Sequence, residues 1–252
     1  MTNEHMDEMK KAAADLGIEL TYSLGLDPYY DISSRDEATR LRGVEYLKNI
    51  VERVGYMGGK VISGVSYQGW GCTDVDPVEG KKPLLENSLK SMRELVKVAA
   101  DNDITYCVEA VNRFEGCLIN TAQEALDYVN AVNSPNIGIL LDTYHMNIEE
   151  SSFSEAIHLA GDKLVNFHTG DNNRRCPGRG HIDFDEIFKA LGDIHYTGRI
   201  VSEPFVATGG EVGNAVALWR DLEPDMSPEY RDKEAAYLLQ YEKEKLAKYG
   251  LA

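Results

Sequence analysis

Hydrophobic and polar positions along the chain follow two periods, one typical of helices and one typical of buried strands. Apolar residues recur at intervals of three and four in several segments, and the clearest set is Leu41, Val44, Leu47, Ile50 and Val51. That spacing places the set on one face of a helix. Between the helical segments lie short runs, such as 58–67 and 136–142, that are apolar on both faces. Strands of this kind are typical of parallel sheets covered on each side. The pattern therefore indicates an α/β protein in which helices and strands alternate.

The alternation predicts specific elements. We expect strands at residues 18–24, 58–67, 104–111, 136–142, 163–170 and 198–205. We expect helices at 5–16, from a cap at Ser34 through Val51, and at 85–102, 121–132, 154–160, 184–191 and 228–249. No linker rich in Pro or Ser divides the chain. We therefore predict a single domain over residues 1–252.

Composition and charge narrow the functional classes. The chain has 252 residues, of which 26 are Lys or Arg and 42 are Asp or Glu, so its net charge is −16. This charge repels phosphate backbones and disfavours a nucleic-acid partner. The four cysteines have no C-x-x-C spacing, which argues against a zinc ribbon and fits a reducing compartment. The first residues lack the apolar core of a signal peptide, and no apolar run approaches the roughly 18 residues of a membrane span. We expect a soluble, cytoplasmic protein with no membrane partner.

Regular alternation of strands and helices leaves two architectures, a doubly wound open sheet and a (β/α)₈ barrel. A dinucleotide-binding open sheet is expected to carry G-x-G-x-x-G after an early strand, and no glycine-rich stretch of this chain has that pattern. A barrel is expected to carry polar functional residues at the carboxyl ends of several strands. The residues at the strand ends therefore decide between the two.

Four of the predicted strands carry a carboxylate or an imidazole at or near their carboxyl ends, and these residues are Glu109, Asp142, His168 and Glu203. The intervals between them are 33, 26 and 35 residues, each close to the roughly 30 residues of one strand–helix unit. Because the upper ends of barrel strands converge on one mouth, these side chains are expected to meet in space. Three carboxylates and one imidazole suit Mn²⁺, Mg²⁺ or Co²⁺. An unpaired charge beside an apolar run is costly, and a bound metal removes that cost.

The segments around these residues resemble one family. They read VEAVNRFEGCLINTAQEA at 108–125, LDTYHMNIEESS at 141–152, FHTGDNNRRCPGRGHIDFDEI at 167–187 and IVSEPFVATGGEVG at 200–213. Together they resemble the ketose 3-epimerases, a group that includes the D-tagatose, D-psicose (D-allulose) and L-ribulose 3-epimerases. That group belongs to the xylose isomerase-like TIM barrels, so the resemblance implies a (β/α)₈ fold and C3 epimerisation of free ketoses.

The resemblance also implies roles for individual residues. One divalent ion, Mn²⁺ most readily and otherwise Co²⁺ or Mg²⁺, is expected on Glu109, Asp142, His168 and Glu203. Glu109 and Glu203 are also the expected catalytic pair, which removes a proton from one face of C3 and returns one to the other. The sugar is expected to contact Glu115, His145, Arg174 and Trp70. Relatives of this kind are dimers or tetramers, so a homo-oligomer is expected.

Two other functions stay open. One is a metal-dependent aldose–ketose isomerase of the same superfamily, including enzymes that act on sugar phosphates. The other is an inactive barrel that serves as a binding subunit. Only six strand–helix units are predicted, and the helix at 6–17 resembles the second helix of the family. We therefore expect a barrel that lacks its first two strands and first helix. Such a barrel is expected to have weakened or lost activity, broadened specificity and a tendency to aggregate or oligomerise through the exposed sheet edges.

Overall fold

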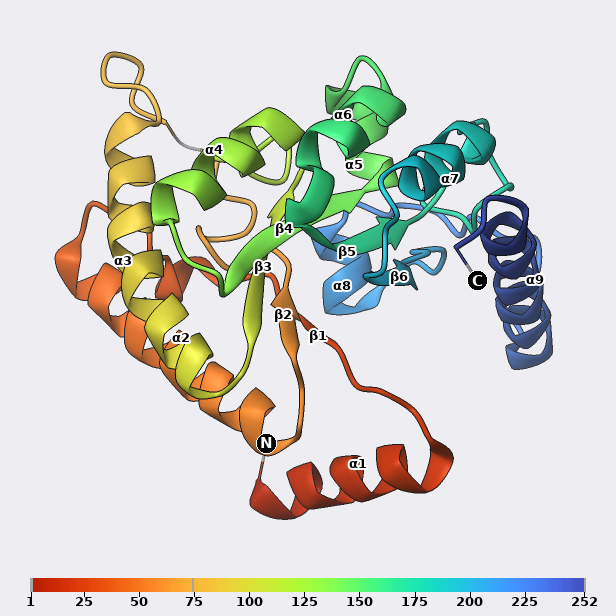
Figure 1. The fold of residues 1–252 in the computed structure, drawn as a ribbon, viewed down its shortest axis with the longest axis horizontal. Helices are drawn as coiled ribbons and strands as arrows, with labels where there is room; N and C mark the ends of the chain where they lie inside the picture. Colours follow the sequence, from red (N-terminus) through yellow and green to blue (C-terminus); the bar gives the residue numbers. More distant parts are fainter. Residues whose placement is uncertain (1, 74, 252) are drawn as a thin grey trace. The chain divides into compact units, whose positions relative to one another are not determined.

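The computed structural model describes residues 2–73 and 75–251 and contains, within them, one sheet of six strands in sequence order (Figure 1). Strand β1 pairs in parallel with β2, β2 with β3, and β5 with β6. Parallel strands in sequence order, separated by helices, are the arrangement of a (β/α) barrel. The prediction of six strand–helix units in a parallel α/β fold is confirmed.

The described chain divides into two compact units, Met1–Leu140 and Leu141–Ala252, and the division falls inside β4 (Ile137–Asp142). The prediction that residues 1–252 form a single domain stays a prediction. Among the described residues, no helix combines the length and the apolar character needed to cross a bilayer.

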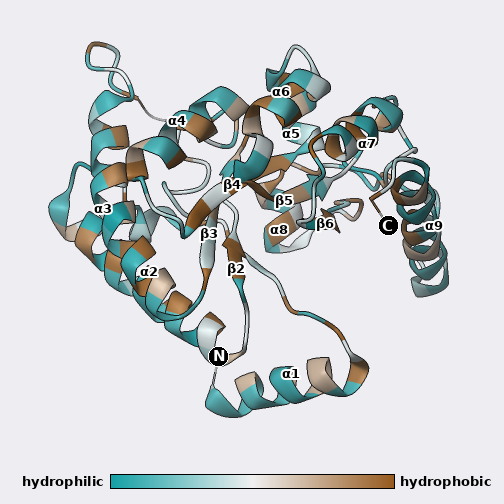
Figure 2. Ribbon diagram, viewed as in Figure 1, coloured by the Kyte–Doolittle hydropathy of each residue, from teal (hydrophilic) through white to brown (hydrophobic). Residues whose placement is uncertain are grey.

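The first unit contains the amino-terminal strands and their helices. In chain order these are α1 (Asn3–Leu16), β1 (Tyr22–Ser23), the 3-10 helix η1 (Pro28–Tyr30), α2 (Glu37–Tyr56), β2 (Val61–Ser63), α3 (Lys82–Asp101), β3 (Thr105–Ala110) and α4 (Ala122–Val132). Helices α2 and α3 pack against each other. Their apolar faces form the core with fully buried residues such as Leu47, Leu95 and Ile62. Figure 2 shows the contrast between hydrophobic β2 and largely hydrophilic α1.

The second unit contains the carboxyl-terminal strands. After β4 come α5 (Thr143–Glu149), α6 (Phe153–Ala160), the 3-10 helix η2 (Gly161–Lys163), β5 (Leu164–Thr169), α7 (Phe184–Asp193), β6 (Arg199–Ser202), α8 (Gly210–Ala215) and α9 (Pro228–Lys248). Helices α6 and α7 pack together, and Ile157, Phe188 and Leu191 are fully buried. Strands β5 and β6 pair from Asn166 with Arg199 to Thr169 with Ser202.

Some local predictions are corrected. Helix α2 begins after Asp36 and not at Ser34, because the Asp36 carboxylate accepts the Thr39 N–H at 3.0 Å, whereas the Ser34 hydroxyl accepts the Asp36 N–H at 3.1 Å. Helices α5 and α8 were not expected, because they are short, with seven residues in α5 and six in α8. The first two strands are shorter than expected, with two residues in β1 and three in β2. The other expected helices and strands are present within a few residues of their predicted limits.

Candidate active site

Three of the predicted metal ligands lie together in the second unit. Asp142 is the last residue of β4, His168 is near the end of β5, and Glu203 directly follows β6. Each offers one ligand atom, and these atoms lie within 4.8 Å of one another. His168 Nδ1 and Glu203 Oε2 are 3.6 Å apart. The carboxyl ends of neighbouring parallel strands bring the three residues together, as the strand-end argument predicts.

The two carboxylate oxygens of Asp142 differ, since one caps a helix and the other has no hydrogen-bond partner among the described residues. Its Oδ1 caps α5 and accepts the N–H groups of Tyr144 at 2.7 Å and His145 at 3.3 Å. Its Oδ2 is buried and has no hydrogen-bond partner among the described residues. A buried carboxylate oxygen without a partner carries a large desolvation cost. A cation at this oxygen would remove that cost, so the local structure fits a metal ligand.

The ring of His168 is oriented by its neighbours. One ring nitrogen, Nδ1, faces Glu203, and the other, Nε2, lies 3.2 Å from the side-chain amide nitrogen of Asn166. A polar contact to the nitrogen that does not bind metal is the usual way in which a ligating histidine is held in orientation. His168 is only 2% exposed, so its ring is fixed by packing as well.

The fourth predicted ligand, Glu109, belongs to the first unit and lies on β3. Its side chain is buried, and its backbone carbonyl accepts the Tyr67 hydroxyl at 2.8 Å. With Asp142, His168 and Glu203 it makes up one candidate metal-binding group of the described residues. Three carboxylates with one imidazole form a mainly oxygen donor set, which suits Mn²⁺, Mg²⁺ or Co²⁺ better than a metal that prefers thiolates.

Two predicted sugar contacts, Trp70 and Glu115, lie together in the first unit. The Trp70 indole Nε1–H donates to Glu115 Oε2 at 3.3 Å, and the Asn112 amide donates to Glu115 Oε1 at 3.0 Å. The Trp70 ring packs on Gly25, where a Cβ would come within 2.7 Å of the ring. The glutamate and the indole are therefore held in one arrangement by contacts that the sequence did not reveal.

The other two predicted sugar contacts, His145 and Arg174, lie in the second unit. The Arg174 guanidinium carbon is 3.7 Å from the centre of the Tyr144 ring and 5.2 Å from that of Phe205. Both distances are within the range of cation–π attraction. Arg174 has a left-handed backbone with φ of 64°. Its position thus depends on a tight loop and two aromatic rings, and neither ring was predicted.

His145 is almost fully buried, and burial lowers its pKa to about 3, although the nearby Asp142 carboxylate acts in the opposite direction. A neutral imidazole can donate from one nitrogen and accept at the other. His145 can therefore offer a hydrogen bond without placing a second positive charge beside Arg174.

We expect the His145 ring to stay neutral from pH 8 down to pH 5. Below about pH 6.5 the unfolded chain takes up a proton at this histidine, and the folded chain does not. The free energy of unfolding should therefore fall with decreasing pH between about 6.5 and 3, by at most about 1.4 kcal/mol per pH unit from this group. NMR titration of the ring carbons tests this. A midpoint near 6.5 would show that the ring is open to solvent.

Asp171 organises the loop that carries Arg174, a role that was not predicted from the sequence. The residue is fully buried and its side chain accepts four backbone N–H groups at 2.7–3.2 Å, those of Asn172, Gly178, Gly180 and Ile182. Its backbone carbonyl accepts the Arg174 N–H at 2.9 Å. An Asp in a loop rich in Gly and Asn is a turn signal, and that signal was available.

Replacing Asp171 with Ala should lower the free energy of unfolding by about 3 kcal/mol or more, because several buried N–H groups lose their acceptor. Urea unfolding followed by circular dichroism measures the change. Asp171→Asn is the matched variant. Its free energy of unfolding should fall by less, because the amide oxygen still accepts hydrogen bonds from backbone N–H groups. Equal, small losses for both variants would contradict the role of Asp171 in the loop.

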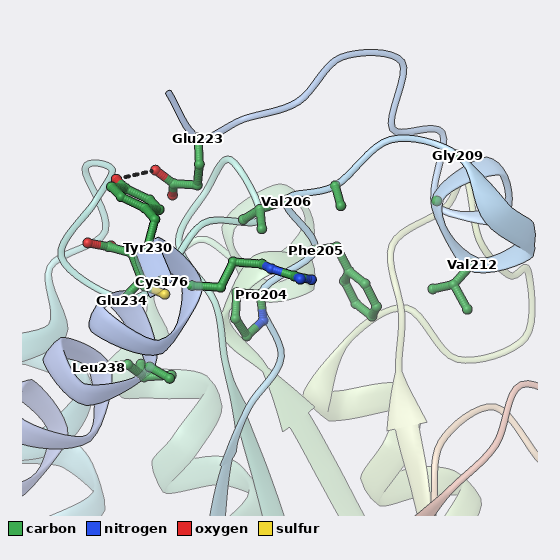
Figure 3. A pocket seen from close by; sticks show the side chains of 14 residues that line it. Cys176, Pro204, Phe205, Val206, Gly209, Val212, Glu223, Tyr230, Glu234 and Leu238 are labelled. Atoms are coloured by element: carbon green, nitrogen blue, oxygen red, sulfur yellow. Dashed lines mark hydrogen bonds between the residues drawn. The ribbon is translucent and has the colours of Figure 1, made fainter. Parts of the chain in front are cut away.

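A separate cavity of about 450 Å³ lies in the second unit (Figure 3). It is lined mainly by apolar groups, among them Pro204, Val206 and Leu238, and one edge carries Glu223, which accepts the Tyr230 hydroxyl at 3.1 Å. Glu223 is also paired with Arg175 at 2.7 Å. None of the sequence-predicted site residues lines this cavity, so it is distinct from the candidate metal-binding group.

Comparison with known proteins gives consistent matches along most of the chain. Residues 1–235 match the family described as xylose isomerase-like TIM barrel. A D-psicose 3-epimerase from Ruminiclostridium cellulolyticum is 39% identical over 236 residues, which cover 94% of this chain and 80% of that protein. An L-ribulose 3-epimerase from a Methylomonas species is 36% identical over 202 residues, with coverages of 79% and 70%.

A solved structure gives the same result. The structure of D-psicose 3-epimerase with D-tagatose, from Clostridium cellulolyticum H10, superposes with a TM-score of 0.93 at 38% identity. The match covers 98% of this chain and 85% of that one.

Proposed function

The chain belongs to the ketose 3-epimerase group of the xylose isomerase-like TIM barrels, and we propose that it epimerises free ketoses at C3 with one divalent metal ion. Its relatives are named epimerases, which are isomerases, and the chain is an enzyme of that class. Candidate substrate pairs are D-fructose with D-psicose, D-tagatose with D-sorbose, and ribulose with xylulose.

The observation that carries the proposal is the candidate metal-binding group of Glu109, Asp142, His168 and Glu203. The buried Oδ2 of Asp142, which lacks a partner among the described residues, supports a cation at this group. We assign all four residues as ligands of one ion. Manganese is the preferred candidate, with Co²⁺ and Mg²⁺ as alternatives, because the donor set is mainly oxygen.

The ion would supply Lewis acidity toward the oxygens at C2 and C3 of the sugar. The remaining chemistry belongs to the side chains. The C3 hydrogen is α to the C2 carbonyl, so its removal as a proton leaves the electron pair of the C3–H bond in an enediolate. Return of a proton to the opposite face of C3 restores the ketose with inverted configuration. The step consumes nothing and needs no oxidant.

We assign the two proton transfers to Glu109 and Glu203. Inversion requires a base on one face of C3 and an acid on the other, and two carboxylates from different strands can supply them. The residue that removes the proton in one direction returns it in the other, so neither is acid or base in an absolute sense. Each would use one carboxylate oxygen for the ion and the other for the proton.

The remaining predicted residues would hold the sugar. Arg174 and neutral His145 are suited to hydrogen-bond oxygens near C1 to C3, and Glu115 is suited to accept from a hydroxyl group. The indole of Trp70 offers an apolar face. Because Glu115 and Arg174 are each held by neighbouring side chains, they would bind the sugar with little loss of side-chain freedom.

Incubation with single ketoses tests the proposed function. The purified chain is given D-fructose, D-tagatose or D-ribulose with Mn²⁺, and in parallel with excess chelator, and products are separated by chromatography. We expect the 3-epimer with Mn²⁺ and no conversion with chelator. An aldose product would instead support an aldose–ketose isomerase, and absence of conversion of any sugar would support an inactive barrel.

A further inference from the structure

A cluster of three oxygen atoms joins α9 to the ends of β5 and β6. Glu242 Oε1, on α9, accepts the Thr169 hydroxyl at 2.5 Å and the Ser202 hydroxyl at 2.7 Å. The two hydroxyl oxygens are themselves 2.7 Å apart. We call the three residues that carry these atoms, Glu242, Thr169 and Ser202, the oxygen cluster. It lies within the second unit, where α9 runs beside β6 in Figure 1.

The oxygen cluster is adjacent in sequence to two predicted metal ligands. Thr169 directly follows His168, and Ser202 directly precedes Glu203. Thr169 and Ser202 are also paired in register, and the Glu203 N–H donates to the Thr169 carbonyl at 2.9 Å. Because successive side chains of a strand point to opposite faces, a contact that fixes Thr169 on one face also fixes His168 on the other.

The pairing of β5 with β6 needs a contact that fixes its register. Strand β6 has only four residues, and all of them are partly exposed. A short strand has few ladder hydrogen bonds, and a shift of one residue would turn its side chains to the other face. Glu242 is a costly group to place here, since burial raises its pKa while the two hydroxyl groups act to lower it.

We propose that Glu242 is a positioning residue for the metal site, which holds the ends of β5 and β6 in register through Thr169 and Ser202 and so sets the spacing of His168 and Glu203. The inference rests on the proposed function, because it assigns His168 and Glu203 as ligands. The competing explanation is that Glu242 only attaches α9 to the rest of the unit.

Another contact of α9 separates the two explanations. Lys245 Nζ lies 2.8 Å from Asp185 Oδ1 on α7 and therefore also attaches α9. Lys245 also lies over the ring of Tyr241, and within the part of the chain that the structure describes neither of these two contacts reaches β5 or β6. Removal of the Lys245 ammonium group weakens only the attachment of α9. Removal of the Glu242 carboxylate weakens both the attachment of α9 and the register of β5 and β6. Lys245→Ala is therefore the matched control.

The experiment measures Mn²⁺ affinity by calorimetric titration, together with urea unfolding of the metal-free chain, for the full chain and three variants. Glu242→Leu should bind Mn²⁺ about tenfold more weakly or worse, in line with losses of outer contacts at other metal sites. Glu242→Gln keeps an acceptor oxygen and should recover most of the affinity. Lys245→Ala should lose stability and keep the affinity of the unmodified chain.

A second readout does not depend on metal. In the metal-free chain, hydrogen exchange of the Glu203 amide should be faster in Glu242→Leu than in Lys245→Ala, because that amide closes the β5–β6 ladder. If Glu242→Leu does not fold, Ser202→Ala replaces it, with the same expected loss of affinity.

The outcomes distinguish this inference from the proposed function. Unchanged Mn²⁺ affinity in Glu242→Leu, beside tight binding by the unmodified chain, would overturn the positioning role alone. Equal losses of affinity in Glu242→Leu and Lys245→Ala would also overturn it, because helix attachment would then explain both. An unmodified chain that binds no Mn²⁺ would overturn the metal site of the proposed function, and the positioning role would fall with it.

Discussion

Glu203→Gln is expected to lower the exchange of the ketose C3 hydrogen with solvent by about 10³-fold, while the chain stays folded. A correctly placed proton carrier contributes on the order of 10²–10⁴ to the rate, and an amide cannot remove the proton. Glu203 is also an assigned metal ligand, so part of the loss would come from weaker metal binding. The variant is therefore assayed at saturating Mn²⁺, with bound metal measured in the same sample.

The measurement follows deuterium at C3 of D-fructose, or of the ketose that the product assay identifies, by NMR in D₂O. Glu211→Gln is the matched control, because Glu211 is exposed on α8 a few residues farther along the same segment. It should exchange deuterium at the unmodified rate. Normal exchange in Glu203→Gln would remove Glu203 from proton transfer and leave it, at most, a ligand.

The sequence predicted the candidate metal-binding group because the signal at each strand end is local. At Asp142 and His168 an apolar run is interrupted by a group that is costly to bury, and the topology of parallel strands then determines which edge the group occupies. The interval between such residues reflects the length of a strand–helix unit, which varies little. Position in the sheet therefore follows from the pattern without knowledge of tertiary contacts.

The contacts that hold the site could not be predicted in the same way. Glu242 lies in the mostly polar helix α9, and its partners Ser202 and Thr169 are 40 and 73 residues away. No periodicity within α9 distinguishes Glu242 from the neighbouring glutamates. The cap of α2 shows the same limit on a local scale, because Ser34 and Asp36 are both good capping residues and only the backbone geometry selects Asp36.

The buried oxygen of Asp142 gives the sharpest test of the metal. Asp142→Asn should abolish most of the stabilisation that Mn²⁺ confers, without a loss of stability in the metal-free chain. Asn caps helices about as well as Asp, so the bonds to Tyr144 and His145 can persist. The substitution removes the charge from Oδ2, which has no partner among the described residues and gains only from a cation.

For a ligand that binds only the folded state, a concentration of 100 times the dissociation constant stabilises a chain by about 2.7 kcal/mol. We expect a gain of this size for the unmodified chain in urea unfolding at such a concentration of Mn²⁺, and less than about 1 kcal/mol for Asp142→Asn at the same concentration. Asp183→Asn is the matched control. Asp183 caps α7 through the N–H groups of Asp185 and Glu186 and does not belong to the candidate metal-binding group, so this variant should keep the full gain.

The comparison of the two aspartates separates capping from metal binding. If both variants lose stability in the presence of chelator and keep the Mn²⁺ gain, Asp142 is a cap and the metal lies elsewhere. If only Asp142→Asn loses the gain, its carboxylate carries a charge that the fold alone does not compensate. A buried oxygen of that kind costs free energy in the metal-free chain, and its retention at a strand end is explained by the cation that it binds.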